Sequence, residues 1–174
     1  MTFTILTVCT ANICRSPVME QVLRSRLDAE RFRVHSAGAV GWEGNEIDGD
    51  ARSQLVRLGV DVQPFTARRL AAEHVAESDL VLTATREHRA AVLSAAPAGL
   101  RKTFTLLEFD ALLQHSNAAT LRDLVTDAAI NRTLAPAEID IEDPFQRGTE
   151  VHARVADLIA ETAGRVAERL NALV

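Results

Sequence analysis

Short apolar runs alternate along this chain with segments whose apolar residues recur at helical spacing. Four apolar runs predict β-strands, at residues 3–8, 32–37, 79–83 and 103–106. Five helices are predicted between and after the strands. The first is capped by Ser16 with Pro17 at its first position, and the second is capped by Asp48 or Asp50 and ended by Gly59. The others are a short helix over 67–72, one from Thr85 through Leu93, and a last one from Thr149. This alternation predicts an α/β fold of three layers, in which helices flank a four-stranded parallel sheet.

Residues 111–138 have the least regular pattern. The spacing over 121–130 fits a helix, but its flanks are polar and typical of loops. The 174 residues suit one ordinary domain, residues 1–174. We expect 111–138 to be a variable, inserted segment of that domain.

Composition excludes several classes of protein. The chain has 19 Lys and Arg against 24 Asp and Glu, a net charge of −5, which argues against nucleic acid as its main partner. No apolar run approaches the roughly 20 residues of a membrane span, and the first residues read as a strand instead of a signal peptide. Two cysteines are too few for a disulfide framework, so we expect a cytoplasmic protein, with secretion by a route without a signal peptide left open. The oligomeric state is left open as well.

Candidate chemistry lies in the loop between the first strand and the first helix, Cys9-Thr10-Ala11-Asn12-Ile13-Cys14-Arg15-Ser16-Pro17. Open α/β sheets bind ligands at such strand ends. Inward backbone N–H groups and the helix N-terminus would hold an anion there and stabilise a thiolate at Cys9. The planar guanidinium of Arg15 matches two phosphate oxygens.

These residues together predict phosphoryl transfer to sulfur. The Cys9 thiolate would attack phosphorus in line, and water would hydrolyse the resulting phosphocysteine. Backbone N–H groups and Arg15 would meet the developing charge, so no metal or other cofactor is required. Zinc binding by Cys9 and Cys14 is disfavoured, because they form no Cys-x-x-Cys pair and no His lies at ligand spacing.

Other loop residues have supporting roles or alternative interpretations. Asn12 can adopt the left-handed conformation that the loop needs and fix it by hydrogen bonds. The Ser16 hydroxyl can donate to the Cys9 thiolate, cap the helix, or do both. Cys9 could instead be a buried thiol that packs as a small apolar residue, although Asn12, Arg15 and Ser16 around it make that interpretation the weaker one.

The string Val-Cys-x-x-Asn-Ile-Cys-Arg-Ser-Pro closely resembles the low-molecular-weight branch of the protein tyrosine phosphatases. The resemblance extends to Ser36-Ala37-Gly38, Asp48 and the 79–82 strand. It implies hydrolysis of phosphotyrosine in protein substrates. It also implies that the general acid is the Asp of an Asp-Pro-aromatic motif, here Asp143-Pro144-Phe145, chosen over Asp140 and Glu142 nearby.

The same resemblance implies roles for the remaining site residues. Cys9, Arg15 and Asp143 would be catalytic, and Asn12, Ser16 and Ser36 would support the loop. The expected substrate-binding residues are Thr10, Ala11, Asn12, Ile13, Cys14, Ser16, Trp42 and Phe145. Cys14 would either form a protective disulfide with Cys9 under oxidation or be a passive loop residue.

The sequence departs from the family pattern at four places. Ala11 replaces a loop Gly, Phe65 a His, and Thr85 an Asp, while only Phe145 remains of an aromatic pair. The chain has no Tyr, so regulation by phosphorylation of that pair is impossible. None of these changes touches the nucleophile, the phosphate-binding Arg or the acid.

Three alternatives use the same loop. An arsenate reductase of this fold would need an external thiol, since no cysteine follows Cys14. Protein-arginine phosphatases typically carry Thr where Ile13 stands, and the larger apolar Ile13 favours an aryl ring. A non-catalytic phosphate-binding module would be expected to lack Cys9 or Asp143. The five histidines pair with no nucleophile, and 86–89 is expected to be an exposed helix face.

Overall fold

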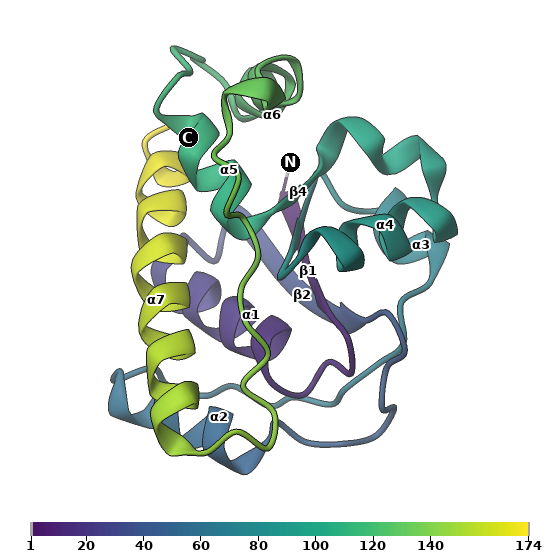
Figure 1. Ribbon diagram of the computed structural model, residues 1–174. Coiled ribbons are helices and arrows are strands. Elements are labelled where there is room, and N and C mark those ends of the chain that lie inside the picture. Colours follow the sequence, from purple (N-terminus) through teal and green to yellow (C-terminus); the bar gives the residue numbers. More distant parts are fainter. Residues whose placement is uncertain (1, 174) are drawn as a thin grey trace.

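A twisted sheet of four parallel strands forms the centre of the computed structural model, which describes residues 2–173. The strands are β1 (Phe3–Cys9), β2 (Phe32–Gly38), β3 (Leu80–Thr83) and β4 (Thr103–Thr105), in the spatial order β2-β1-β3-β4 (Figure 1). Cys9 pairs with Gly38 and Val8 with Thr83, so the carboxyl ends of the three longer strands meet at one edge.

Seven α-helices and two short 3-10 helices connect and cover the strands. The α-helices are α1 (Arg15–Arg26), α2 (Gly49–Arg57), α3 (Ala72–Ala76), α4 (Arg86–Ala95), α5 (Leu106–Leu113), α6 (Leu121–Ile130) and α7 (Thr149–Asn171). The 3-10 helices are Pro97–Lys102 and Arg132–Leu134.

The helices form a layer on each face of the sheet. On one face, Ile5, Leu80 and Phe104 pack with apolar residues of α1, α2, α5, α6 and α7 in the main core. On the other face, Leu6 and Val81 pack with residues of α3 and α4 in a smaller core. The predicted three-layer α/β fold with a four-stranded parallel sheet is therefore confirmed.

The predicted short helix over 67–72 is wrong. Residues 67–71 are extended, and α3 begins only at Ala72. Backbone groups here hydrogen-bond to the end of β2 and not along a helix. The N–H of Leu70 donates to Gly38 O, and Arg69 forms a parallel bridge with Gly38. The helical spacing of the apolar residues was outweighed by this pairing along the edge of β2.

Helix starts match the sequence in most places but not at α1. Asp48 and Thr85 cap α2 and α4, α7 begins at Thr149, and residues 121–130 form α6, all as the pattern indicated. Ser16 does not cap α1, whose N-cap is Cys14, because the Ser16 hydroxyl bonds elsewhere. Helix α5 was not predicted, although Thr105 and Glu108 form a reciprocal capping box at its start.

Candidate active site

The loop over residues 10–14 connects the end of β1 to the start of α1 and lies against β2. Gly38 of β2 makes this close approach possible, since a Cβ there would lie 2.6 Å from Thr10 O and 2.8 Å from Asn12 N. A side chain at position 38 would therefore push the loop outward.

Backbone carbonyls of the loop point away from its centre. The carbonyls of Cys9, Thr10, Ala11 and Ile13 accept hydrogen bonds from N–H groups in the segment 39–48. Among the described residues, none accepts a hydrogen bond from the backbone N–H groups of 11–14. The loop therefore presents a ring of free donors, which suits an anion.

Asn12 fixes the loop through three side-chain hydrogen bonds, two of them buried. Its backbone φ is 62°, the left-handed conformation that Asn tolerates. Its Nδ2 donates to Ser16 Oγ at 2.9 Å and to Ser36 Oγ at 2.8 Å, and its Oδ1 accepts from the N–H of Arg68 at 2.9 Å. The side chain thus ties the loop to β2, to α1 and to the segment after α2.

The Cys9 thiol lies 3.0 Å from Ser16 Oγ and is almost fully buried. Ser16 Oγ accepts from Asn12, and Ala37 O, its other acceptor, is 3.5 Å away, so its proton can donate to the closer Cys9 sulfur. Ser36 in turn donates to Glu20, a buried carboxyl whose pKa is raised by burial, although Ser36 and Arg24 oppose the shift. No pattern in the sequence indicates that Glu20 belongs to this network.

Arg15 crosses from α1 to the segment before α7. Its Nη1 donates to Ile141 O at 2.9 Å, and its Nη2 lies 3.4 Å from Asp143 Oδ2. The Nε is buried and has no hydrogen-bond partner among the described residues. A buried N–H without an acceptor is costly, so this guanidinium is suited to receive a further oxygen.

Only one of the three candidate carboxylates faces Cys9. Asp140 accepts hydrogen bonds from the backbone and the guanidinium of Arg86, and Glu142 pairs with Arg147 and Arg154. Asp143, by contrast, lines the same small cavity as Cys9, and its side chain is 54% exposed.

This catalytic cavity, of about 90 Å³, has an apolar rim. The rings of Trp42 and Phe145 meet edge to face with centroids 5.5 Å apart, and Trp42 is exposed. The cavity brings together nine of the predicted site residues: Cys9, Thr10, Ala11, Ile13, Cys14, Arg15, Trp42, Asp143 and Phe145. Asn12, Ser16 and Ser36 lie behind it.

The prediction that 86–89 is an exposed face is wrong at His88. This side chain is buried, and its Nε2 lies 2.8 Å from Oγ1 of Thr10, the residue directly after Cys9. Its Nδ1 lies 3.0 Å from Thr85 Oγ1. Burial, together with the charge of Arg15, lowers the pKa of His88 to about 4, so the ring is neutral near pH 7. The contact depends on tertiary structure, so no local pattern reveals it.

Cys14 is a buried free thiol, and Cys9 is free as well. Burial raises the pKa of Cys14 well above its usual range, and the charges of Asp48, Cys9 and Asp143 act in the same direction. The neutral thiol is therefore the stable form of Cys14 in this structure.

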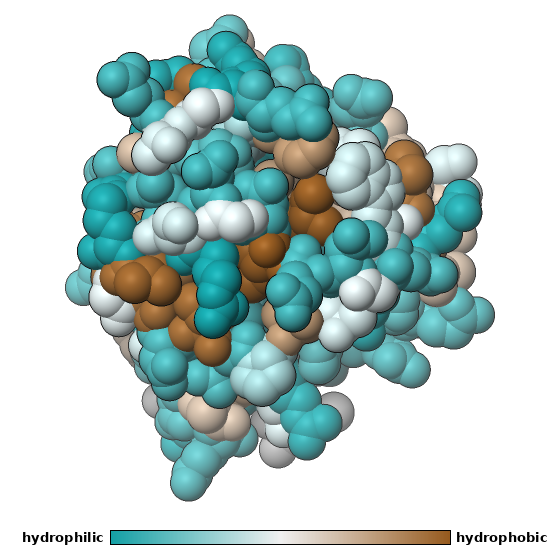
Figure 2. All heavy atoms as spheres, turned by 90° about the horizontal axis from the view of Figure 1, so that it is seen from below, coloured by the Kyte–Doolittle hydropathy of each residue, from teal (hydrophilic) through white to brown (hydrophobic). Residues whose placement is uncertain are grey.

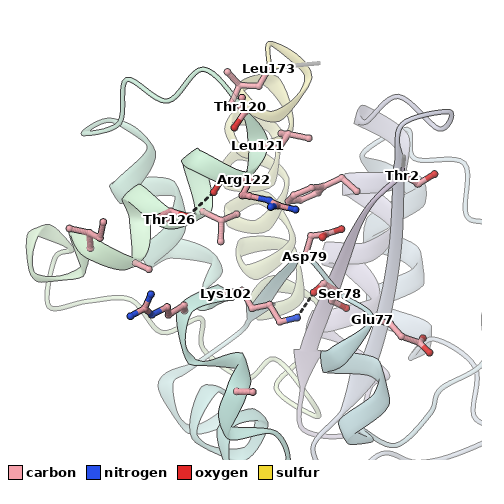
Figure 3. Close-up of a pocket in the computed structure, with 16 residues that line it drawn as sticks. Thr2, Glu77, Ser78, Asp79, Lys102, Thr120, Leu121, Arg122, Thr126 and Leu173 are labelled. Carbon is pink, nitrogen blue, oxygen red and sulfur yellow. Dashed lines mark hydrogen bonds between the residues drawn. The ribbon is translucent and has the colours of Figure 1, made fainter.

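A much larger cavity lies elsewhere, at the opposite ends of β1 and β3. It measures about 1160 Å³, and Figure 3 shows its labelled polar side chains. Several are already paired: Lys102 donates to Ser78 O, Thr126 donates to Arg122 O, and Asp79 accepts from the N–H of Thr4. None of its lining residues is a Cys or His, so it lacks the chemistry of the smaller site.

The surface at the loop end of the molecule is mixed in character. Figure 2 shows this end, where apolar side chains form patches between hydrophilic ones. Exposed apolar residues that follow β2 include Val40 and Trp42. Within residues 2–173, no helix is both long and apolar enough to cross a membrane.

Comparisons with known proteins agree on one family. A family model for the low molecular weight phosphotyrosine protein phosphatases matches residues 4–123. The chain is 35% identical over 102 residues to the low molecular weight protein-tyrosine-phosphatase Ptp of Acinetobacter johnsonii, covering 59% of this chain and 70% of that protein. It is 28% identical over 171 residues to a protein-arginine-phosphatase of Geobacillus stearothermophilus, covering 98% of each.

Solved structures give the same fold. Wzb of Vibrio vulnificus in complex with benzylphosphonate superimposes with a TM-score of 0.75 and 26% identity, covering 97% of this chain and 99% of that one. The family match ends before Asp143, so the place of that residue in the site comes from the structure described above.

Proposed function

The chain belongs to the low molecular weight phosphotyrosine protein phosphatase family, whose members are phosphoric monoester hydrolases, and on this premise we propose how its site works. Cys9 is the nucleophile, Arg15 binds the phosphoryl group and Asp143 is the general acid in the hydrolysis of phosphotyrosine in proteins. The observation that carries the proposal is the set of unpaired donors around the Cys9 sulfur: the N–H groups of 11–14 and the Nε of Arg15.

In the first step the Cys9 thiolate attacks phosphorus in line with the tyrosyl oxygen. The S–P bond forms as the P–O bond breaks, and the electron pair leaves with the oxygen, which takes a proton from Asp143. The loop N–H groups and Arg15 meet the charge on the equatorial oxygens. Ser16, 3.0 Å from the sulfur, stabilises the thiolate before attack and after release.

In the second step water attacks the phosphocysteine. The Asp143 carboxylate accepts a proton from the water, the S–P bond breaks and the thiolate returns as inorganic phosphate leaves. The half-exposed position of Asp143 suits both steps, since it can reach the leaving oxygen and then the entering water. The cycle needs the reduced form of Cys9, as in a cytoplasmic setting.

The walls of the catalytic cavity favour an aromatic leaving group. Trp42 and Phe145 stand edge to face at its rim, and Ile13 lies within it. A phenyl ring held between them would bring its phosphate to the loop. Phosphotyrosine is therefore the proposed substrate, and the protein that carries it is left open.

A second candidate is phosphoarginine. The relative from Geobacillus stearothermophilus that matches along the whole chain is named a protein-arginine-phosphatase. The exposed carboxylate of Asp143 at the mouth could pair with a guanidinium there. Ile13 argues for the aryl substrate, because it offers no hydrogen bond to the guanidinium nitrogens.

The nucleophile is tested with Cys9→Ser. This variant should lose hydrolysis of an aryl phosphate while it still binds phosphate or vanadate, because the donors remain. Retained turnover would contradict the assignment of Cys9.

The acid is tested by varying the leaving group. Asp143→Asn should slow poor leaving groups by about 10² to 10⁴ and activated ones much less. Glu142→Gln is the matched control from the same motif, since its carboxylate pairs with Arg147 and Arg154. An equal loss with both leaving groups would place the acid elsewhere.

Substrate class is decided by phosphotyrosine and phosphoarginine peptides at matched concentrations. We expect the larger kcat/KM with phosphotyrosine. A larger value with phosphoarginine would select the second candidate. Reduction of arsenate with an added thiol, without activity on either peptide, would instead indicate a reductase.

A further inference from the structure

Three potential metal-ligating side chains converge beside the catalytic loop. They are Cys14 of the loop, Asp48 at the start of α2 and His152 in the first turns of α7. Their ligand atoms all lie within 4.8 Å of one another, and His152 Nε2 is 3.8 Å from Asp48 Oδ1. The residues are distant in sequence, so spacing could not reveal the cluster.

His152 is the unusual member of this cluster. Only 3% of its side chain is exposed, yet neither ring nitrogen hydrogen-bonds to any of residues 2–173. A small cavity of about 10 Å³ is lined by His152 together with the apolar side chains of Val18, Ala51 and Val155. Asp48 Oδ1 lies 3.8 Å from Nε2, which is beyond hydrogen-bond distance, so this nitrogen is available as a ligand on the side of Cys14 and Asp48.

Cys14 and Asp48, the other two members of the cluster, can also act as metal ligands. The Cys14 thiol makes no hydrogen bond to a described side chain, and its sulfur is the soft donor of the set. Asp48 uses Oδ1 to cap α2 through the N–H groups of Asp50 and Ala51, which leaves Oδ2 available. The backbone N–H of Asp48 donates to Ile13 O at 2.8 Å, and this bond holds the carboxylate against the loop.

We propose that Cys14, Asp48 and His152 form a binding site for a divalent cation of the zinc class. Thiolate, imidazole and carboxylate together suit a borderline-soft ion, and hard ions such as Mg²⁺ prefer oxygen alone. Bonds of about 2.0–2.3 Å need ligand atoms about 3.5 Å apart, so the cluster closes by roughly 1 Å when it binds. Water completes the coordination on the partly exposed Asp48 side.

Binding changes the protonation of Cys14. The S–H bond breaks, its proton goes to bulk water, and the sulfur lone pair forms the bond to the metal. The net charge beside Arg15 and Cys9 then rises by one, because the cation brings two positive charges and one proton leaves. The closure also draws the loop N–H group of Cys14 away from the ring of donors.

The effect on activity rests on the proposed function. With the site filled, the metal charge opposes the nucleophilicity of Cys9 and the loop loses its shape, so phosphatase activity should fall at least tenfold. A chelator should restore it. The metal would also occupy the Cys14 sulfur and prevent a disulfide with Cys9.

Binding itself is tested in the inactive Cys9→Ser protein with Co²⁺, whose thiolate complexes absorb in the near ultraviolet. One equivalent should produce the absorption band, and Zn²⁺ should displace it. His152→Gln should weaken binding at least 30-fold, whereas the matched control His115→Gln, at an exposed position, should not change it. Cys14→Ser should remove the band.

Three outcomes of the Co²⁺ experiment are distinguished: binding to the nucleophile alone, unchanged affinity in the variant, and a variant that does not fold. A band seen with Cys9 intact but absent in Cys9→Ser would show that the metal binds the nucleophile alone, and would overturn the proposal. So would equal affinity in His152→Gln and the wild type. If His152→Gln does not fold, Asp48→Asn replaces it, since Asn still caps α2 but should bind metal at least tenfold more weakly. Failure of the phosphatase assays leaves the Co²⁺ result unaffected.

Discussion

The neutral, buried His88 should make the stability of this protein depend on pH. Burial and Arg15 hold its pKa in the folded state at about 4, although Asp143 and Asp140 favour the charged ring, whereas the ordinary value is 6.5. Between these values the unfolded chain binds a proton that the folded protein does not. Stability is therefore fully present above about pH 6.5 and is lost as the pH falls toward 4.

The size of this loss in stability follows from the shift in the pKa of His88. One pKa unit corresponds to about 1.4 kcal/mol, so the free energy of unfolding should fall by about 2.5 kcal/mol between pH 7 and pH 4.5 on account of His88. His88→Gln removes the titration but retains a side-chain N–H that can reach Thr10. The other histidines and the carboxylates titrate in both proteins, so their contributions cancel.

Urea unfolding at pH 7 and pH 4.5 measures the difference. The wild type should lose about 2.5 kcal/mol more than His88→Gln over this range. His115→Gln, which changes an exposed ring, should behave as the wild type. An equal loss in the wild type and His88→Gln, or an NMR titration of His88 with a midpoint near 6.5, would refute the reasoning.

Three further substitutions test the loop. Asn12→Ala removes three side-chain hydrogen bonds at a left-handed position and should lower the free energy of unfolding by about 3–5 kcal/mol. Asn12→Gly should cost about 1 kcal/mol less, and equal costs in urea unfolding would contradict the role of φ. Gly38→Ala should weaken phosphate binding, measured by calorimetry, because its Cβ displaces the loop; unchanged affinity would mean that the loop adapts. Ser16→Ala should lower kcat for aryl phosphates by about 10- to 100-fold through the lost bond to Cys9, and a change in stability alone would argue against that bond.

The sequence predicted β3 most clearly because this strand is buried on both faces. Leu80, Val81 and Leu82 are consecutive apolar residues, and this pattern identifies a central parallel strand without reference to partners. The extended segment 67–71 was misread because its conformation depends on hydrogen bonds to Gly38 and Asn12, which are distant in the chain. Helix α5 was missed because it follows β4 without a loop.

The residues of the candidate site also divide into those that a local sequence pattern identifies and those that only distant contacts reveal. Residues of the loop and of the Asp-Pro-Phe motif could be picked out from one contiguous string each, because their chemistry depends on local spacing. Glu20, His88 and His152 could not, since each acts on the loop from a different helix. Their signal is burial of a polar side chain, which only the folded structure shows.

Hydrogen bonds of Asp140 and Ile141 hold the segment that carries Asp143 in place. Ile141 donates its N–H to Ala84 O and accepts from Arg15 Nη1, and Asp140 holds both the backbone and the guanidinium of Arg86. Arg15 can keep its bond to Ile141 while its Nε and Nη2 turn to a phosphoryl group. Phosphate binding would then release Asp143 from Arg15 without moving the backbone that positions it. The same guanidinium would therefore both bind the anion and align the proposed acid, so Arg15→Lys should impair the two functions together even though it conserves the charge.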